Sequence, residues 1–192
     1  MTSNLSLADE KHRLRKEALA RRKAMAEIVR IEKSLALADH VSDLPIPAGA
    51  IVAGFWPIRD EIDPRPLLDR LRQNGHTLCL PVVAEPHLIF RKLDRGCVME
   101  NAGFGTMAPG PNAEELLPDV LLMPLAGFDR LGNRIGYGKG HYDTAISALE
   151  KSGPLLCIGL AFALQEVELV PAEGHDKPLA GILTEDGYRS FC

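Results

Sequence analysis

Apolar side chains along this chain recur with two different periods, and the change of period separates expected helices from expected strands. Over the first forty residues the spacing is close to helical, with no proline or glycine between the apolar positions Leu14, Ala18, Met25, Ile28, Leu35 and Leu37. Asp9 is a candidate N-cap for this segment. A further helix is expected to open at Asp63-Pro64 and to close at Asn74-Gly75, because proline suits a first turn and glycine a helix end.

Shorter apolar runs bounded by turn residues predict strands. These runs cover residues 50–56, 76–83, 87–93, 120–125, 155–162 and 181–184. Residues 94–118 hold glycines, prolines and few periodic apolar positions, so an irregular connection is expected there. Because strands and helices alternate, the pattern predicts one α/β domain over residues 1–192 with a largely parallel central sheet.

A basic, glycine-dense loop follows the apolar run 120–125. Glycines at positions 132, 136, 138 and 140 surround Arg134 and Lys139. Asp143 can then cap a helix expected over residues 144–151. A strand, a glycine loop and a helix start together turn backbone N–H groups and a helix dipole toward a phosphate, so this segment predicts nucleotide binding.

The loop matches neither of the two commonest phosphate-binding motifs. Gly138-Lys139 is followed by Gly140 rather than Ser or Thr, as a Walker A loop would require. His141 stands where the dinucleotide fingerprint needs its third glycine. A plain tight turn with incidental charge therefore remains an alternative for these residues alone.

Composition bounds the class of protein. The hydrophobic content is 46% and the charged content 25%, as in ordinary globular domains, and the formal net charge is -4. An acidic chain has no global attraction for nucleic acid or an anionic membrane, and no apolar run is long enough to suggest a membrane span. The four cysteines show no CxxC spacing, and residues 1–17 lack the apolar core of a signal peptide, so we expect a cytoplasmic protein. We also expect a monomer.

Acidic side chains follow several of the expected strands. They are Asp60 and Glu61 in one turn, Asp143 after the glycine loop, and Asp176 in the tail. Since ligands gather at the carboxyl ends of parallel strands, a basic loop with two aspartates suits a magnesium nucleotide. Helix capping by Asp143 and simple solvation of Asp176 are the alternatives. Lys11 and Arg15 lie four apart on one helix face, where they can grip phosphate or be solvated.

The segment from Pro124 to Asp143 resembles the hallmark of the 5-formyltetrahydrofolate cyclo-ligase family. That hallmark reads approximately P-G-x-(A/G)-F-D-x-x-G-x-R-(L/I)-G-(Y/R)-G-(K/G)-G-Y-Y-D, and here it stands as PLAGFDRLGNRIGYGKGHYD. Weaker matches occur in the right order elsewhere: Lys11-His-Arg-Leu-Arg15, Asp60-Glu-Ile-Asp63, and Val170-Pro171 through Asp176, followed by Thr184-Glu185. The resemblance spans residues 11 to about 185.

The resemblance implies a three-layer α/β/α Rossmann-like domain and an ATP- and Mg²⁺-dependent ligase of one-carbon metabolism. In the implied reaction ATP phosphorylates the formyl oxygen of 5-formyltetrahydrofolate, N10 attacks the activated carbon, and loss of phosphate leaves 5,10-methenyltetrahydrofolate and ADP. A formyl oxygen is a poor leaving group until it is converted to phosphate. The protein's tasks are therefore positioning and charge neutralisation.

The resemblance also implies roles for particular residues. ATP is expected to bind Lys11, Arg15, Arg134, Ile135, Gly136, Tyr137, Gly138, Lys139, Gly140, His141 and Tyr142. Among these, Arg134, Lys139 and Tyr142 are the expected catalytic residues. Asp143 and Asp176 are expected to bind Mg²⁺. The folate pocket is expected to contain Trp56, Glu61, Tyr137 and His141, with an interior anchor as the alternative for Trp56.

Two other functions stay open at this point. A divergent relative would keep ATP and Mg²⁺ but activate another formyl or amide compound, and His141 in place of the first tyrosine of the usual Tyr-Tyr-Asp is a departure that favours it. A non-catalytic nucleotide- or nucleic-acid-binding module would use the basic first helix. The acidic net charge and the lack of aromatic residues among the basic ones disfavour that module.

Overall fold

The computed structural model describes residues 6–84, 87–103, 105–171 and 177–191. Within these residues the α-helices are α1 (Leu7–Ala24), α2 (Glu27–Ala36), α3 (Arg65–Gln73) and α4 (His141–Leu149), with 3₁₀ turns η1 (Leu37–Asp43) and η2 (Ala163–Gln165). The strands are β1 (Ile51–Ala53), β2 (Thr77–Ala84), β3 (His87–Lys92), β4 (Met99–Asn101), β5 (Met107–Pro109), β6 (Val120–Pro124), β7 (Gly127–Phe128), β8 (Arg134–Ile135), β9 (Leu156–Leu160), β10 (Gly181–Thr184) and β11 (Gly187–Ser190).

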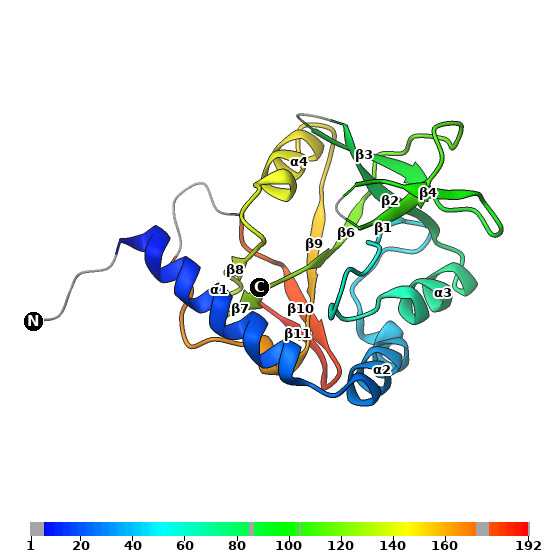
Figure 1. Cartoon of the computed structure of the whole chain (residues 1–192). Coiled ribbons are helices and arrows are strands. Elements are labelled where there is room, and N and C mark those ends of the chain that lie inside the picture. Colours follow the sequence, from blue (N-terminus) through cyan, green and yellow to red (C-terminus); the bar gives the residue numbers. More distant parts are fainter. Residues whose placement is uncertain (1–5, 85–86, 104, 172–176, 192) are drawn as a thin grey trace, which may run out of the picture.

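The main sheet has the strand order β11-β10-β9-β6-β1-β2-β3 (Figure 1). Its five inner strands are parallel, and β11 and β3 pair antiparallel at the two edges. The predicted α/β class with a largely parallel sheet is therefore confirmed. Strands covered on both faces are apolar along their whole length, which is why β6 and β9 were readable as continuous apolar runs.

Helices cover both faces of this sheet, so the predicted three layers are confirmed (Figure 1). Val120 and Leu122 of β6 pack with Leu67 of α3 in one core, whereas Leu121 and Met123 pack with α4 in another. This alternation follows from the two-residue period of a strand. Helix α1 lies apart from both cores and packs on the β7–β8 hairpin through a third cluster.

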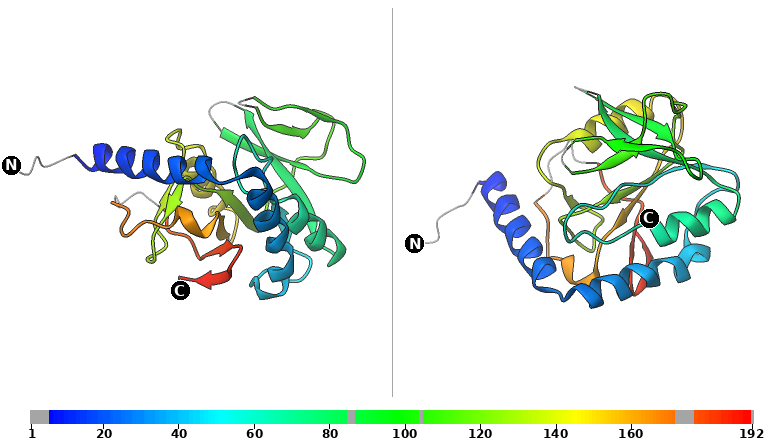
Figure 2. Two further views of the ribbon diagram at one scale, coloured as in Figure 1. Left: turned by 60° about the horizontal axis from the view of Figure 1, so that its bottom comes forward. Right: turned by 45° about the vertical axis from the view of Figure 1, so that its right-hand side comes forward.

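The first forty residues form two helices rather than one, and together α1 and α2 bend as an L around the domain (Figure 2). Met25 and Ala26 are extended between them, with ψ of 132° and 145°. The prediction of Asp9 as the cap was wrong. Ser6 is the N-cap, its Oγ accepting from the Asp9 N–H at 3.2 Å, and Asp9 lies in the first turn.

Three other local predictions needed correction. The 94–118 segment is not wholly irregular, because β4 and β5 form a short antiparallel hairpin within it. The strand expected over residues 50–56 is limited to β1. The chain also continues past β10 into β11, which the sequence pattern did not indicate. The missed strands β4, β5 and β11 are three or four residues long, and β7 and β8, which were not expected either, have two residues each, so all are too short to show a period.

Candidate functional site

A large cleft of about 1320 Å³ opens at the carboxyl ends of β1, β2 and β6. Side chains after β1, the second half of β2 and the end of β6 form its floor, as expected for ligand sites in parallel sheets. Every predicted site residue within the described ranges lines this cleft: Lys11, Arg15, Trp56, Glu61, Arg134, Ile135, Gly136, Tyr137, Gly138, Lys139, Gly140, His141, Tyr142 and Asp143. Asp176 lies outside the described residues.

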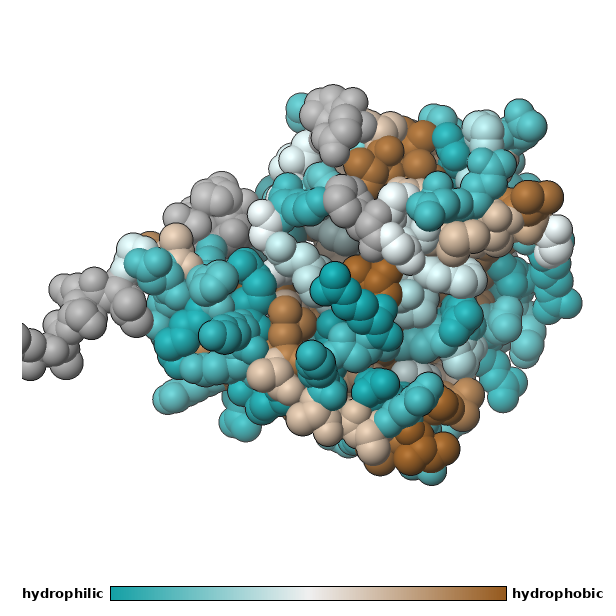
Figure 3. Space-filling view, in the orientation of Figure 1, coloured by the Kyte–Doolittle hydropathy of each residue, from teal (hydrophilic) through white to brown (hydrophobic). Residues whose placement is uncertain are grey.

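One face of α1 forms a wall of the cleft. Lys11, Arg15, Leu19 and Arg22 all line it, and their spacing of four, four and three residues keeps them on one side of a helix. Arg15 also supports the glycine loop, because its Nε–H donates to the Gly136 carbonyl oxygen at 2.8 Å. The solvent side of α1 is strongly hydrophilic (Figure 3), and there Arg13 pairs with Glu10 and Glu17.

Asp129 holds the base of the glycine loop. Its side chain is fully buried, and its Oδ1 accepts from the N–H groups of Leu131 and Asn133 at 2.9 and 3.0 Å. Its Oδ2 accepts from the Asn133 amide and from the Val170 N–H, both at 2.9 Å. A buried carboxylate with four donors ties the β7–β8 hairpin to the segment after η2, so the loop starts from a fixed base.

The glycines of the loop are required for different reasons. Gly138 and Gly140 have φ of 88° and 68°, a conformation that side chains with a Cβ rarely adopt. Gly136 is not among the positive-φ glycines, and a Cβ placed on it would meet no atom within 4 Å. Neither backbone conformation nor protein packing requires a glycine at 136. Open space beside that backbone is what the close approach of a ligand needs.

Helix α4 begins at His141, with Gly140 as its N-cap, so the prediction of Asp143 as the cap of a helix starting at residue 144 was wrong. Asp143 lies in the first turn, and its Oδ1 accepts instead from Arg134 Nη2. The other Nη of Arg134 donates to the Lys177 carbonyl oxygen. The start of a helix carries unpaired N–H groups and a partial positive charge, and this one lies at the cleft.

A polar network centred on the buried Arg22 extends from the α1 wall of the cleft. Arg22 is 3% exposed, and its Nη1 donates to the Tyr137 hydroxyl at 2.7 Å while its Nη2 donates to Asp60 Oδ1 at 3.1 Å. Tyr137 in turn hydrogen-bonds the Glu61 carboxylate, whose Oε2 also accepts from the Ile58 N–H at 2.9 Å. The network joins α1, the glycine loop and the turn after β1.

Burial sets the proton affinities in this network. Desolvation raises the pKa of Glu61, which is 8% exposed, against the opposing hydrogen bond from Tyr137 and the charge of Arg22. Desolvation and the Glu61 carboxylate raise the pKa of the Tyr137 phenol, and the same two causes raise that of Tyr142. For Asp60 the desolvation is outweighed by its hydrogen bond to Arg22, so its pKa is lowered.

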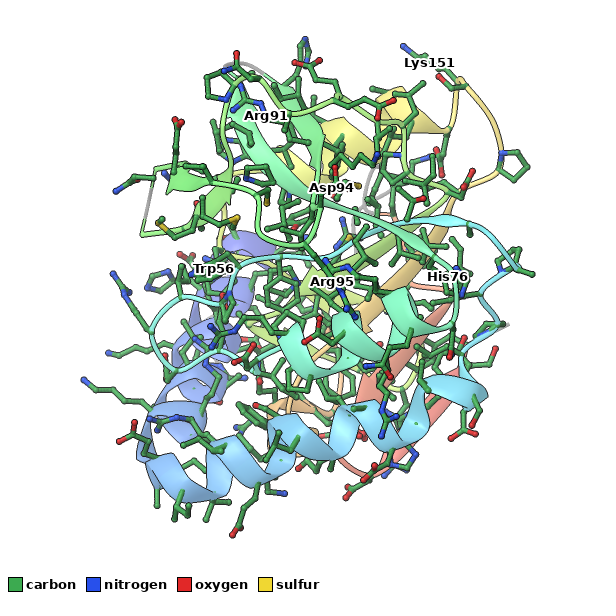
Figure 4. The ribbon with its side chains drawn as sticks, turned by 90° about the vertical axis from the view of Figure 1, so that its right-hand side faces the viewer. Trp56, His76, Arg91, Asp94, Arg95 and Lys151 are labelled. Carbon is green, nitrogen blue, oxygen red and sulfur yellow. The ribbon has the colours of Figure 1, made fainter. Side chains whose placement is uncertain are left out.

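Apolar side chains cover the remaining wall of the cleft. They are Phe55, Trp56, Ile58, Pro81, Val83, Leu88, Met107 and Met123. Trp56 is half-buried in the connection that leaves β1, far from Lys151 in the turn after α4 (Figure 4). The Arg65 guanidinium lies 5.1 Å from its ring centroid. Such a wall suits a flat, partly apolar ring system.

The cleft is cationic although the chain is acidic. Of its described lining residues, nine are Lys or Arg and three are Asp or Glu, whereas the whole chain carries a formal charge of -4. The local excess of positive charge suits an anion with several charges. Among the parts of the chain that the structure describes, no group of three or more potential metal-ligating side chains occurs, and Asp143 is the predicted metal ligand that the cleft contains.

Of the described residues that line the cleft, none is a cysteine. Cys79 and Cys157 are buried core residues, and burial raises their pKa values to about 12 and about 11. A thiol with a raised pKa is a poor nucleophile near neutral pH.

Sequence reasoning missed Arg22 and Lys177 as cleft residues. Arg22 stands in the basic run Arg21-Arg22-Lys23, where the helical period alone assigns most charges to a solvated face. Its spacing from Lys11 and Arg15 was the available signal, since the three recur at helical intervals. The sequence around Lys177 gave no indication that this residue lines the cleft.

Comparison with known proteins decides the family. A profile of the 5-formyltetrahydrofolate cyclo-ligase family matches residues 8–185. The chain belongs to the 5-formyltetrahydrofolate cyclo-ligase family. The family and enzyme class predicted from the glycine-rich segment are thereby confirmed. The 5-formyltetrahydrofolate cyclo-ligase of Haemophilus influenzae is 29% identical over 85% of this chain and 96% of its own. That of Mycolicibacterium smegmatis is 30% identical over 91% and 93%.

Solved structures agree with this assignment. The 5,10-methenyltetrahydrofolate synthetase of Aquifex aeolicus superposes with a TM-score of 0.79 at 29% identity, covering 94% of this chain and 92% of its own. A synthetase from Mycoplasma pneumoniae shares the fold, with a TM-score of 0.71 at 24% identity. In the described part of this family member, no helix is long and apolar enough to cross a membrane.

Proposed function

We propose that this protein converts 5-formyltetrahydrofolate to 5,10-methenyltetrahydrofolate at the expense of ATP, with Mg²⁺ as the metal. The observation that carries the proposal is one cleft that a glycine loop, a helix start, a buried carboxylate and an apolar wall all line. The names of the relatives support the same reaction. Cytoplasmic location and a monomeric state stay predictions.

The cationic half of the cleft fits a triphosphate. Lys11, Arg15, Arg134 and Lys139 supply positive charge, the start of α4 supplies backbone donors, and Gly136 leaves open space for close approach. Mg²⁺ takes few protein carboxylates and keeps phosphate oxygens and waters as its other ligands, so Asp143 beside these cations fits that preference. Asp176 remains the second predicted metal ligand.

The other half of the cleft fits the folate. An ionised carboxylate has about four acceptor sites, and at Glu61 the Ile58 N–H and the Tyr137 hydroxyl take two of them. The remaining sites can accept the two neighbouring N–H donors of an amino-pterin ring. Trp56 and its apolar neighbours then cover the ring faces.

Bound ATP supplies the phosphoryl group that turns the formyl oxygen into a leaving group. The residues of the chain position the two substrates and neutralise the charge of the phosphates. Arg134 and Lys139 offset charge on the phosphates, and Tyr137 stands between the two halves of the cleft, bonded to Arg22 and Glu61. The apolar wall excludes water from the activated carbon, so that N10 is the nucleophile that reaches it.

The deciding experiment is a spectrophotometric turnover assay. Protein, Mg-ATP and 5-formyltetrahydrofolate should together produce the methenyl chromophore, with one ADP and one phosphate released per product, and omission of any component should abolish it. Robust ATP hydrolysis with another formyl or amide compound, and none with this folate, would favour the divergent relative. Salt-sensitive RNA or DNA binding without turnover would favour the binding module, although α1 turns Lys11, Arg15 and Arg22 into the cleft.

A further inference from the structure

Arg22 is the most deeply buried charge of the cleft, and the proposed chemistry assigns it no contact with either substrate. Its side chain is 4% exposed and that of its partner Asp60 is 19% exposed. One donor of the guanidinium, Nε–H, is buried without a hydrogen-bond partner among the described residues. A buried charge with an unsatisfied donor costs stability, so a purely structural explanation for Arg22 is a poor one.

The contacts of Arg22 connect segments that are distant in sequence. Tyr137, on the glycine loop, is 115 positions away, and Asp60, on the turn after β1, is 38 positions away. The guanidinium also lies 5.9 Å from the Tyr137 ring centroid. Arg22 donates to the phenol oxygen, which leaves the phenol hydrogen for Glu61. The chain of bonds therefore runs in one direction, from Arg22 through Tyr137 to the carboxylate.

Tyr137 needs this support. Its residue is 39% exposed and it lies between Gly136 and Gly138, neither of which has a side chain to hold it. Without Arg22, the hydroxyl would have only the Glu61 carboxylate as a side-chain partner in the network. Arg15 holds the neighbouring Gly136 carbonyl and the Ile58 N–H holds one oxygen of Glu61, but Arg22 is the residue that joins these two parts of the cleft through Tyr137.

We propose that Arg22 is a positioning residue that joins the glycine loop to the folate pocket, holding the Tyr137 hydroxyl against Glu61 and facing that carboxylate with positive charge. The inference rests on the proposed function and deepens it, because it names the group that keeps Glu61 ready to accept the donors of the pterin. Asp60 acts on Glu61 in the opposite sense to Arg22, because the negative charge of Asp60 disfavours a negative charge on the neighbouring Glu61.

The charged and titratable groups that face Glu61 come from four segments. They are Arg22 of α1, Asp60 of its own turn, Tyr137 of the glycine loop and Tyr142 of α4. The two phenols have raised pKa values and stay neutral at neutral and acidic pH. Arg22 favours the ionised form of Glu61 and Asp60 disfavours it. Substitution of these two residues must therefore move the titration of Glu61 in opposite directions.

The test is the pH profile of kcat/KM for 5-formyltetrahydrofolate at saturating Mg-ATP. Arg22→Gln should move the acid limb upward by about one pH unit and lower the plateau about tenfold, whereas Asp60→Asn should move the limb downward. Arg22→Lys keeps the charge but not the two-pronged geometry, so its limb should stay near that of the wild type while its plateau remains low.

A structural role alone would lower the plateau of kcat/KM in every variant and leave the acid limb at its wild-type pH. That result would overturn the inference, and so would acid limbs that move in the same direction in Arg22→Gln and Asp60→Asn. If Arg22→Gln does not fold, Asp60→Asn and Arg22→Lys still carry the comparison. If the wild type does not act on this folate, the proposed function is wrong, but Arg22 is still tested. The Glu61 carboxyl carbon, assigned with Glu61→Gln, can be titrated by ¹³C NMR in the ligand-free protein, where the same opposite shifts are expected.

Discussion

Arg134 and Asp143 bind each other at the start of α4, where Nη2 of the guanidinium donates to Oδ1 of the carboxylate. The two residues are expected to serve different parts of one ligand, Arg134 the phosphates and Asp143 the Mg²⁺. In the ligand-free protein each side chain therefore neutralises the charge of the other. A metal-bound polyphosphate offers each of them the opposite charge again, so the pair can open without leaving either charge unmatched.

Asp143→Asn should raise the Mg²⁺ concentration required for half-maximal activity about tenfold, because an amide oxygen is a weaker ligand for a hard cation than a carboxylate. The measurement is a metal titration at fixed, saturating ATP. Arg134→Gln breaks the same ion pair but keeps the carboxylate, so it should raise the KM for ATP and leave the metal requirement close to that of the wild type. An unchanged metal titration in Asp143→Asn would remove Asp143 from the metal site.

Lys139→Ala should raise the KM for ATP roughly tenfold, since it removes one positive charge from an anion site, and the rise should shrink at high ionic strength. Lys151→Ala is the matched control. Lys151 is exposed in the turn that follows α4 and is not among the cleft-lining residues (Figure 4). Initial rates at several salt concentrations measure both variants. Equal effects of the two substitutions would mean that Lys139 acts only through net charge.

The sequence allowed prediction of those parts of the site that lie on one continuous segment. Residues 134–143 line the cleft because β6, the β7–β8 hairpin, the glycine loop and α4 follow one another along a single stretch of chain, so local pattern was enough. The role of Asp143 as a cap was wrong for a tertiary reason. Gly140 takes the left-handed conformation and starts the helix, and the carboxylate bonds to Arg134 instead.

The parts that could not be predicted depend on contacts between distant segments. Burial of Arg22 requires Tyr137 and Asp60 to meet it, and a run of basic residues on a helix gives no sign of that. The break at Met25 likewise lies in a stretch without proline or glycine, where helix propensity predicts continuity. The three-residue strands β4 and β5 exist only through their pairing with each other.

Gly138→Ala and Gly136→Ala should separate conformational strain from ligand contact within one loop. Alanine at 138 has to adopt a positive φ, so a loss of about 1 kcal/mol in the free energy of unfolding is expected, visible as a lower Tm. Alanine at 136 meets neither strain nor a clash, so its Tm should match the wild type. If a ligand fills the space beside Gly136, that variant should nevertheless raise the KM for ATP. Unchanged Tm and KM would place the phosphates elsewhere.

Glu61→Gln should stabilise the protein at neutral pH while damaging folate binding. Burial raises the pKa of Glu61 in the folded state above its unfolded value of about 4.3, so the charged form is held less well on folding. Below the unfolded pKa both states are protonated and no penalty exists, and as pH rises through the two pKa values stability is lost. The glutamine variant avoids that loss, by about 1.4 kcal/mol for each pH unit between the two values.

Thermal unfolding of the two proteins from pH 4 to pH 8 tests this sign. The advantage of Glu61→Gln should be present at pH 7 and disappear toward pH 4. Its KM for 5-formyltetrahydrofolate should rise more than its KM for ATP, because the substitution removes the acceptor proposed for the pterin. A Glu61→Gln protein less stable than the wild type at pH 7 would show that the carboxylate is held by its hydrogen bonds rather than strained by burial.

Asp129→Ala should destabilise the fold by at least about 3 kcal/mol, because it leaves four buried or half-buried donors around the loop base without their acceptor. Urea unfolding measures the loss. Asp69→Ala is the matched control, since Asp69 is 63% exposed and its pair with Arg72 is a surface ion pair, worth about 0–1 kcal/mol. Because Asp129 acts through the loop and touches no ligand site directly, Asp129→Asn, which keeps one acceptor oxygen, should retain more stability and more ATP affinity than the alanine variant. Equal losses in both would mean that the negative charge, and not the hydrogen-bond geometry, fixes the glycine loop.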